Sequence, residues 1–247
     1  MEKEKMEYLG PKRLSLLQKG AVFPLGMDSM LLSEFATLRR NDRVYDLGCG
    51  IGTLMLLLFS RQEALTISGM EIQREAASLA RENLARNGLC ERASVAEGDL
   101  RAIPETLAPG GHDLVISNPP YFSLSAGKPA GTAARAQARC ALSCSASDVC
   151  RAAAHLLRPK GRFAFLLRPE RLEDWMGALR DCGLAPKRLR CVQHTPQSPP
   201  SLLLLEAMRG GNVGLSFLPP LFASDWNARQ AKQMKHPANT AGQEATP

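Results

Sequence analysis

The stretch that decides the fold of this chain reads Val44-Tyr45-Asp46-Leu47-Gly48-Cys49-Gly50-Ile51-Gly52. Its first four residues have the character of a short strand, and three glycines follow within the next five residues. The apolar run at residues 53–60 then predicts a helix. Glycines between a strand and a helix allow positive φ angles and a close approach of the backbone to a ligand. The stretch therefore predicts the first strand–turn–helix unit of an α/β domain.

The same alternation continues downstream. We expect further strands at residues 66–70, 93–97, 113–117 and 162–167, and helices at residues 73–87, 147–157 and 169–181. Alternating strands and helices predict a doubly wound, mostly parallel sheet with helices on both faces. The strand at residues 113–117 is almost wholly apolar, as in a strand that is covered on both faces. Two last strands, at residues 188–193 and 201–208, have no helix between them and predict an antiparallel edge hairpin.

We divide the chain into three parts. Residues 1–42 are a lead-in that packs on the main domain, with residues 1–20 short helical or irregular, and residues 43–222 are that domain. Residues 223–247 turn polar and predict a disordered tail. Residues 122–146 are rich in Ala, Gly and Ser, and such a long loop is either functional or mobile.

Composition sets the class of protein. The formal net charge of +7 suits an anionic partner such as nucleic acid, although basic enzymes without one are common. No apolar signal core follows the N-terminus, and the longest apolar run, residues 54–59, is too short to cross a bilayer. Apart from Cys140 and Cys144, none of the seven cysteines forms a pair with zinc-ligand spacing. We expect a cytoplasmic protein with reduced thiols, no metal and no membrane, and monomer and homodimer remain open.

Acidic side chains follow three of the expected strands. Asp46, Glu71 and Asp99 all reach the carboxyl edge of the sheet, where such folds bind ligands. Asp46 would repel a pyrophosphate but can receive an ammonium, such as that of a methionine moiety. Glu71 stands where a carboxylate accepts ribose hydroxyls, and Asp99-Leu100 can take an adenine amine and cover the ring. Ordinary explanations are a helix cap for Asp46, a solvated strand end for Glu71 and a turn start for Asp99.

The strand at residues 113–117 is followed directly by Asn118-Pro119-Pro120-Tyr121. A conjugated amine is a poor nucleophile because its lone pair is delocalised. The Asn118 side-chain oxygen and the Pro119 carbonyl can accept its two hydrogens and draw them out of the conjugated plane. Tyr121, with Phe122 beside it, offers a flat face on which a base can stack. The motif predicts a site that holds an amino nitrogen, whereas the ordinary alternative is a turn opened by Asn-Pro.

Together these residues resemble class I S-adenosylmethionine-dependent methyltransferases that act on amino groups. The segment Phe23-Pro24-Leu25-Gly26-Met27-Asp28-Ser29-Met30-Leu31-Leu32 is similar to the F-x-x-G-T-D-x-x-L-L lead-in of the family that methylates adenine 37 in the anticodon loop of tRNA(Val). The resemblance covers residues 19–208. It implies a Rossmann-like seven-stranded sheet, S-adenosyl-L-methionine as the donor, and the N6 amine of an adenine in cytoplasmic tRNA as the acceptor.

The candidate site residues form three sets, and the resemblance adds Asp28 to those that the motifs and the loop composition indicate. The catalytic set is Asn118, Pro119, Pro120 and Tyr121. The cofactor set places Asp28 near the methionine end and adds Asp46, Gly48, Cys49, Gly50, Gly52, Glu71, Ile72, Asp99, Leu100 and Asn118. The substrate set is Tyr121, Phe122, Lys128, Arg135 and Arg139. The three basic residues can contact phosphates, which would position RNA without reading its sequence, or they belong to a solvated loop.

The chain departs from the family pattern at three places. Met27 stands where the family usually has Thr, and Cys49 replaces a small residue or Thr in the loop. Residues 138–142 read Ala-Arg-Cys-Ala-Leu where an Arg-His-Glu-like sequence is usual, which bears on the substrate more than on the reaction. Asp28 has a second interpretation, as the N-cap of a helix that runs through Phe35.

Other functions compete with this hypothesis. A protein glutamine N5-methyltransferase acting on a release factor or ribosomal protein would share the motif, but only about 45 residues precede the glycine turn, too few for the larger N-terminal domain of the release-factor enzymes. An rRNA or small-substrate N-methyltransferase remains an alternative. A non-catalytic RNA-binding module is disfavoured, because it would not need the three acids at the strand ends or the intact Asn-Pro-Pro-Tyr motif. A nucleotide-binding oxidoreductase is disfavoured because its glycine turn usually reads G-x-G-x-x-G, whereas residues 48–52 read G-x-G-x-G. The acid at position 46 would also repel the pyrophosphate of its cofactor.

Overall fold

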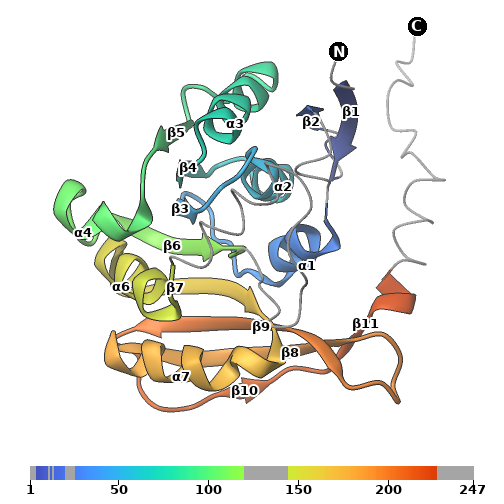
Figure 1. Cartoon of the computed structure of the whole chain (residues 1–247), viewed down its shortest axis with the longest axis vertical. Coiled ribbons are helices and arrows are strands. Elements are labelled where there is room, and N and C mark those ends of the chain that lie inside the picture. Colours follow the sequence, from blue (N-terminus) through green and yellow to red (C-terminus); the bar gives the residue numbers. More distant parts are fainter. Residues whose placement is uncertain (1–3, 11, 13, 20–25, 120–143, 227–247) are drawn as a thin grey trace, which may run out of the picture.

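A computed structural model of the chain describes residues 4–10, 12, 14–19, 26–119 and 144–226, and the account below concerns those residues. Five parallel strands form the centre of the main sheet, in the order β7-β6-β3-β4-β5 (Figure 1). They are β3 (Arg43–Leu47), β4 (Thr66–Glu71), β5 (Ala93–Glu97), β6 (His112–Ser117) and β7 (Leu157–Leu167). The parallel part of the predicted sheet is thereby confirmed.

The order of the strands creates a switch point between β3 and β6. From β3 the chain builds β4 and β5 on one side, and it then returns to build β6 and β7 on the other side. In open α/β sheets, ligands bind at such a point, in a crevice outside the carboxyl ends of the strands. The glycine turn follows β3 and Asn118 follows β6, so both lie where such a crevice is expected.

Helices cover both faces of the sheet, as predicted. One face carries α1 (Met27–Phe35), α2 (Thr53–Arg61) and α3 (Arg74–Arg86), and the other carries α6 (Ala146–Leu156) and α7 (Leu172–Asp181). Successive residues of β6 divide between the two layers: Leu114 and Ile116 belong to the first hydrophobic cluster and Val115 to the second. All three are 0% exposed, which explains why this strand has a continuous apolar sequence.

An antiparallel hairpin extends the sheet beyond β7. β9 (Pro200–Arg209) pairs antiparallel with both β7 and β8 (Leu184–Gln193), so the predicted edge hairpin is confirmed. Two strands of two residues each, β10 (Ser216–Phe217) and β11 (Leu221–Phe222), pair in parallel with β8. Within the described residues the sheet therefore has nine strands, the seven expected ones and these two short additions.

The N-terminal segment forms a hairpin, so the prediction of a helical or irregular lead-in is wrong. β1 (Glu4–Leu9) pairs antiparallel with β2 (Leu14–Lys19). The backbone of Leu17 exchanges two hydrogen bonds with the Asn83 side chain of α3, at 2.8 and 3.1 Å. Asn83 is 0% exposed, and its amide also donates to the carbonyl of Ile51 in the glycine turn at 3.0 Å. The hairpin depends on a partner 66 residues away, which local sequence patterns do not reveal.

Three further short elements are η1 (Leu100–Ala102), α4 (Ile103–Thr106) and η2 (Pro169–Arg171). Residues 223–226 are also helical, and Trp226 is 5% exposed, so the prediction of a disordered tail is wrong for these four residues. α6 begins one residue before the predicted helix at residues 147–157, and its N-cap is Ser145. Ser145 and Asp148 bond reciprocally in a capping box. β7 begins at Leu157, five residues before the predicted strand at residues 162–167, and its first part lies beside a register irregularity against β6. No helix in the described part of the chain is long and apolar enough to span a membrane.

Candidate active site

One buried hydrogen bond joins the ends of the two strands at the switch point. The hydroxyl of Ser117, the last residue of β6, donates to the carbonyl of Leu47, the last residue of β3, at 2.8 Å. Ser117 is 1% exposed. The bond places Asn118 and the glycine turn at the same edge of the sheet, next to each other.

The glycine turn has a backbone that other residues rarely adopt. Gly48, Gly50 and Gly52 have φ angles of 74°, 55° and 82°, all in the left-handed region. Met70 of β4 accepts hydrogen bonds from the backbone N–H groups of Gly48 and Cys49, at 2.9 and 3.1 Å. A Cβ added to Gly48 or Gly50 would meet no atom within 4 Å, so open space lies beside the turn. Gly52 is the N-cap of α2, and Asp46 therefore does not cap that helix.

Cys49 points away from this open space and toward β4. Its thiol is buried, and burial raises the pKa of Cys49 well above the ordinary value. A Cβ added to Gly69 would lie only 3.1 and 3.2 Å from the Cβ and Sγ atoms of Cys49. A side chain at position 69 would therefore require Cys49 to shift by a few tenths of an ångström, and the Cys49 side chain is buried against β4.

Two buried carboxyl groups stand under the turn. Asp46 is 1% exposed, and its Oδ2 atom has no hydrogen-bond partner within the described residues. Burial, followed by the like charge of Glu71, raises the pKa of Asp46 to about 8. Glu71 is 7% exposed and accepts hydrogen bonds from the backbone N–H groups of Gly50, at 3.0 Å, and Gln73, at 2.9 Å.

A buried carboxyl without a partner is costly, and a cationic ligand would relieve that cost. Asp46 supplies the unpaired oxygen, the glycine turn supplies open space beside it, and Glu71 adds a second negative charge. The site thus fits a ligand that carries an ammonium or sulfonium group, and S-adenosylmethionine carries both.

The residues beyond β4 and β5 are more exposed. Ile72 directly follows Glu71 and is 43% exposed, which is unusual for a large apolar side chain. Asp99 is the N-cap of η1 and forms an ion pair with Arg101, which lowers the pKa of the Asp99 carboxyl. The alternative interpretation of Asp99 as a turn start therefore holds, and its contact with an adenine amine stays a prediction. Leu100 is partly buried against the second hydrophobic cluster.

The first helix brings a further set of residues to the same edge. Asp28 is the second residue of α1, whose N-cap is Gly26, so the interpretation of Asp28 as the N-cap is wrong. Burial raises the pKa of Asp28, and Arg168 at the end of β7 partly offsets this. The Nδ2 atom of Asn118 donates to the Ser29 hydroxyl at 3.0 Å, which joins α1 to the residue after β6.

The remaining candidates fall outside the described residues: Pro120, Tyr121, Phe122, Lys128, Arg135 and Arg139. Sequence reasoning missed Ser29, Gly69, Asn83 and Ser117. A signal existed for Ser117, because it is the one hydroxyl in the apolar run 114–117 and stands at its end. The other three acquire their roles from contacts between segments far apart in sequence. Within the described residues no group of three or more His, Cys, Asp or Glu could hold a metal ion.

The known proteins that this chain resembles in sequence and structure are methyltransferases. The family model described as "Methyltransferase small domain" matches residues 25–170. A relative from Parabacteroides distasonis named "tRNA1(Val) (adenine(37)-N6)-methyltransferase" is 31% identical over 200 residues, covering 81% of this chain and 82% of the relative. A protein of the same name from Dickeya chrysanthemi is 33% identical over 189 residues, covering 76% and 73%.

Among solved structures, a predicted O-methyltransferase from Agrobacterium tumefaciens superimposes with a TM-score of 0.65 at 22% identity. It covers 79% of this chain and 87% of that one, which shows a shared fold.

Proposed function

This chain belongs to the methyltransferase small domain family, as an S-adenosylmethionine-dependent methyltransferase, and we propose that it methylates the N6 amine of an adenine in the anticodon loop of tRNA. The observation that carries the proposal is the position of Asn118. It leaves β6 beside the end of β3, where Ser117 bonds Leu47, and so stands next to the glycine turn and the unpaired Asp46 oxygen. The names of the two relatives supply the adenine and the tRNA.

The cofactor would be held by the edge of β3 and β4. In this proposal the Asp46 carboxylate accepts hydrogen bonds from the ammonium, and the glycine turn gives room for the methionine part. Glu71 keeps acceptor capacity beyond its two backbone bonds and would take the ribose hydroxyls. Ile72 would cover one face of the adenine ring, Asp99 and Leu100 would contact its edge, and Asp28 would lie near the methionine end. When bound, S-adenosylmethionine supplies a methyl group that its sulfonium already activates.

The residues after β6 would prepare the acceptor. The Oδ1 atom of Asn118 and the carbonyl of Pro119 accept the two hydrogens of the exocyclic amine and so draw its lone pair out of conjugation. No general base is needed before transfer, because the proton can leave once the methyl group has arrived. Alignment of the amine is then the main catalytic contribution, and well-oriented encounters contribute about 7–11 kcal/mol. Tyr121 and Phe122 would form the stacking wall for the base.

We also propose the domain limits and the location. Residues 43–222 form the methyltransferase domain, and residues 1–42 pack on it, as the contacts between Leu17 and Asn83 support. Lys128, Arg135 and Arg139 would contact RNA phosphates. A tRNA substrate implies a protein of the cytoplasm.

Nucleoside mass spectrometry tests the proposal. Total tRNA from cells with and without the active gene is digested, and N6-methyladenosine should disappear when the gene is deleted and return with the wild-type gene. A gene carrying Asn118→Ala serves as the control that keeps the protein present. Unchanged N6-methyladenosine in the deletion strain, with methylated glutamine lost from a release factor or ribosomal protein, would replace this substrate with the protein alternative.

A further inference from the structure

We propose that Ser29 is a positioning residue that sets the rotation of the Asn118 amide, so that the amide oxygen faces the amine of the substrate. The inference rests on the proposed function, because it assigns Ser29 a role only through Asn118. Its basis is the hydrogen bond of 3.0 Å from Asn118 Nδ2 to Ser29 Oγ.

The chemistry of a carboxamide makes its rotation decisive. One end of the group carries an oxygen that accepts hydrogen bonds, and the other carries an NH₂ group that only donates. The two ends have nearly the same size, so packing alone distinguishes them poorly. If the NH₂ end faced the exocyclic amine, donors would oppose donors and the lone pair would stay delocalised. A serine hydroxyl can accept or donate a hydrogen bond, and here that of Ser29 accepts from the NH₂ end of Asn118. With the bond in this direction, the amide oxygen points away from Ser29.

The Ser29 hydroxyl has a fixed position because α1 is packed and hydrogen-bonded against the rest of the domain. Leu31, Leu32 and Phe35 of this helix are 1%, 0% and 3% exposed. Arg61 of α2 donates to the carbonyls of Ser33 and Ala36 at the end of the helix. The inner face and the last turn of α1 are therefore both fixed.

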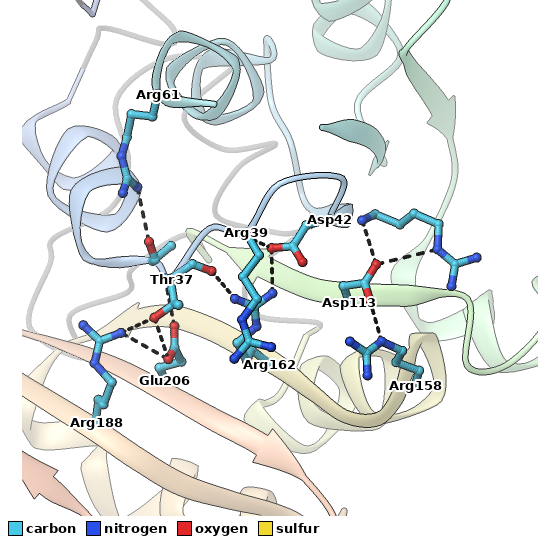
Figure 2. A network of polar contacts seen from close by, with 11 residues as sticks. Thr37, Arg39, Asp42, Arg61, Asp113, Arg158, Arg162, Arg188 and Glu206 are labelled. Carbon is cyan, nitrogen blue, oxygen red and sulfur yellow. Dashed lines mark hydrogen bonds and ion pairs between the residues drawn. The ribbon is translucent and has the colours of Figure 1, made fainter. Parts of the chain in front are cut away.

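A second fastening comes from the edge hairpin. Arg188 of β8 donates to the carbonyl of Phe35 at 3.4 Å, and its guanidinium lies 4.8 Å from the centre of the Phe35 ring. The segment that follows α1 is held as well, because Glu206 of β9 accepts from the backbone N–H and the hydroxyl of Thr37, both at 3.0 Å (Figure 2). The strands β8 and β9 thus hold the C-terminal end of α1 and the residues after it. Ser29 lies in the first turn of the same helix.

Two substitutions of equal shape separate positioning from packing. Ser29→Thr keeps the hydroxyl, whereas Ser29→Val replaces it with a methyl group and has the same branched outline as threonine. We expect Ser29→Val and Ser29→Ala to lower kcat for methyl transfer about tenfold, which is the effect of losing one hydrogen bond of ordinary strength. The KM for S-adenosylmethionine should stay within about twofold, because in this proposal Ser29 does not touch the cofactor. Ser29→Thr should recover most of the turnover.

Ser33→Ala is the matched control. It makes the same change one turn further along α1, and it retains the backbone carbonyl that accepts from Arg61. This variant should keep wild-type turnover, so a loss seen in both serine variants would mean a general weakening of the helix and would overturn the positioning role. Thermal unfolding of each variant confirms that the compared proteins are folded.

Asn118→Ala, measured in parallel, separates the two possible failures. If Asn118→Ala turns over normally, the proposed role of Asn118 falls and the inference about Ser29 falls with it. If Asn118→Ala is inactive but Ser29→Val and Ser29→Ala match the wild type, only the inference about Ser29 is overturned. A valine variant as slow as the alanine variant, with threonine near wild type, supports it.

Discussion

The hydroxyl of Ser117 donates to the carbonyl of Leu47 at 2.8 Å and so bridges the ends of the two neighbouring strands at the switch point. Both residues are 1% exposed. Asn118 and the glycine turn are the next residues along their strands. The Ser117 bond therefore adds to the β3–β6 pairing at the end of the strands that is nearest to both. Removal of the Ser117 hydroxyl should therefore lower both the free energy of unfolding and the rate of methyl transfer.

Ser117→Ala should therefore lower the free energy of unfolding by about 1 kcal/mol, since the buried carbonyl of Leu47 loses its donor. Turnover should fall as well, because the residue before Asn118 loses its side-chain bond to the end of β3. Urea unfolding and steady-state kinetics measure the two effects. Ser94→Ala is the control, because that hydroxyl bonds Ser68 at an exposed place on the same sheet, and its effect should stay within about 0.5 kcal/mol.

Asn118→Ala should nearly abolish methyl transfer while cofactor affinity remains close to that of the wild type. The loss of one preorganised polar group that aligns the reacting atoms typically lowers kcat about 10²–10³-fold. A tritiated-methyl assay gives the turnover, and calorimetry with S-adenosylmethionine gives the affinity. Wild-type turnover, or a loss explained entirely by weaker cofactor binding, would contradict the role of acceptor for the amine.

Asp46→Asn should stabilise the ligand-free protein at alkaline pH while weakening cofactor binding. The pKa of Asp46 is about 8 in the folded protein and about 3.8 as the ordinary value. A carboxyl with a raised folded pKa favours folding at low pH, and this contribution is lost as the pH rises toward 8. The asparagine variant has no charge to bury, so its advantage in thermal stability should grow from pH 5 to pH 9. An advantage that does not change with pH would show that Asp46 is ionised throughout.

Arg162→Met should destabilise the protein by about 3–5 kcal/mol, because it leaves a buried carboxylate without its partner. Arg162 bonds Asp42 at 2.6 Å, and the two side chains are 4% and 5% exposed (Figure 2). Urea unfolding measures the loss. Arg180→Met is the control, because its pair with Asp181 is 82% and 74% exposed and such pairs contribute at most about 1 kcal/mol. Equal effects of the two substitutions would mean that the buried pair is not an important anchor of the segment between α1 and β3.

Binding of tRNA should weaken as salt rises, since the protein's phosphate contacts release counterions. Substitution of Lys128, Arg135 and Arg139 by alanine should reduce the slope of log K against log salt by about 0.7–0.9 for each phosphate that the variant no longer binds. Filter binding with unmodified tRNA transcript at several salt concentrations measures the slope. An affinity that is independent of salt would argue against phosphate contacts altogether.

Local patterns in the sequence predicted the centre of this fold. The strand and glycine turn at residues 44–52, the apolar strand before Asn118 and the edge hairpin each have a pattern that needs no distant partner, and the structure contains them all. The N-terminal hairpin was missed because Asn83 of α3 completes its hydrogen bonds. Ser29 was missed as a site residue for the same reason, since its role depends on Asn118, which lies 89 residues away.

Asn83 gives the first strands of the chain an unexpected influence on the active centre. One buried amide bonds the backbone of Leu17 and also the carbonyl of Ile51. Expression from an internal start codon downstream of residue 19 would remove the Leu17 backbone and leave part of this amide unsatisfied in an apolar interior. Shortened versions of the protein would then show impaired cofactor loading, even though every residue assigned to the cofactor would still be present.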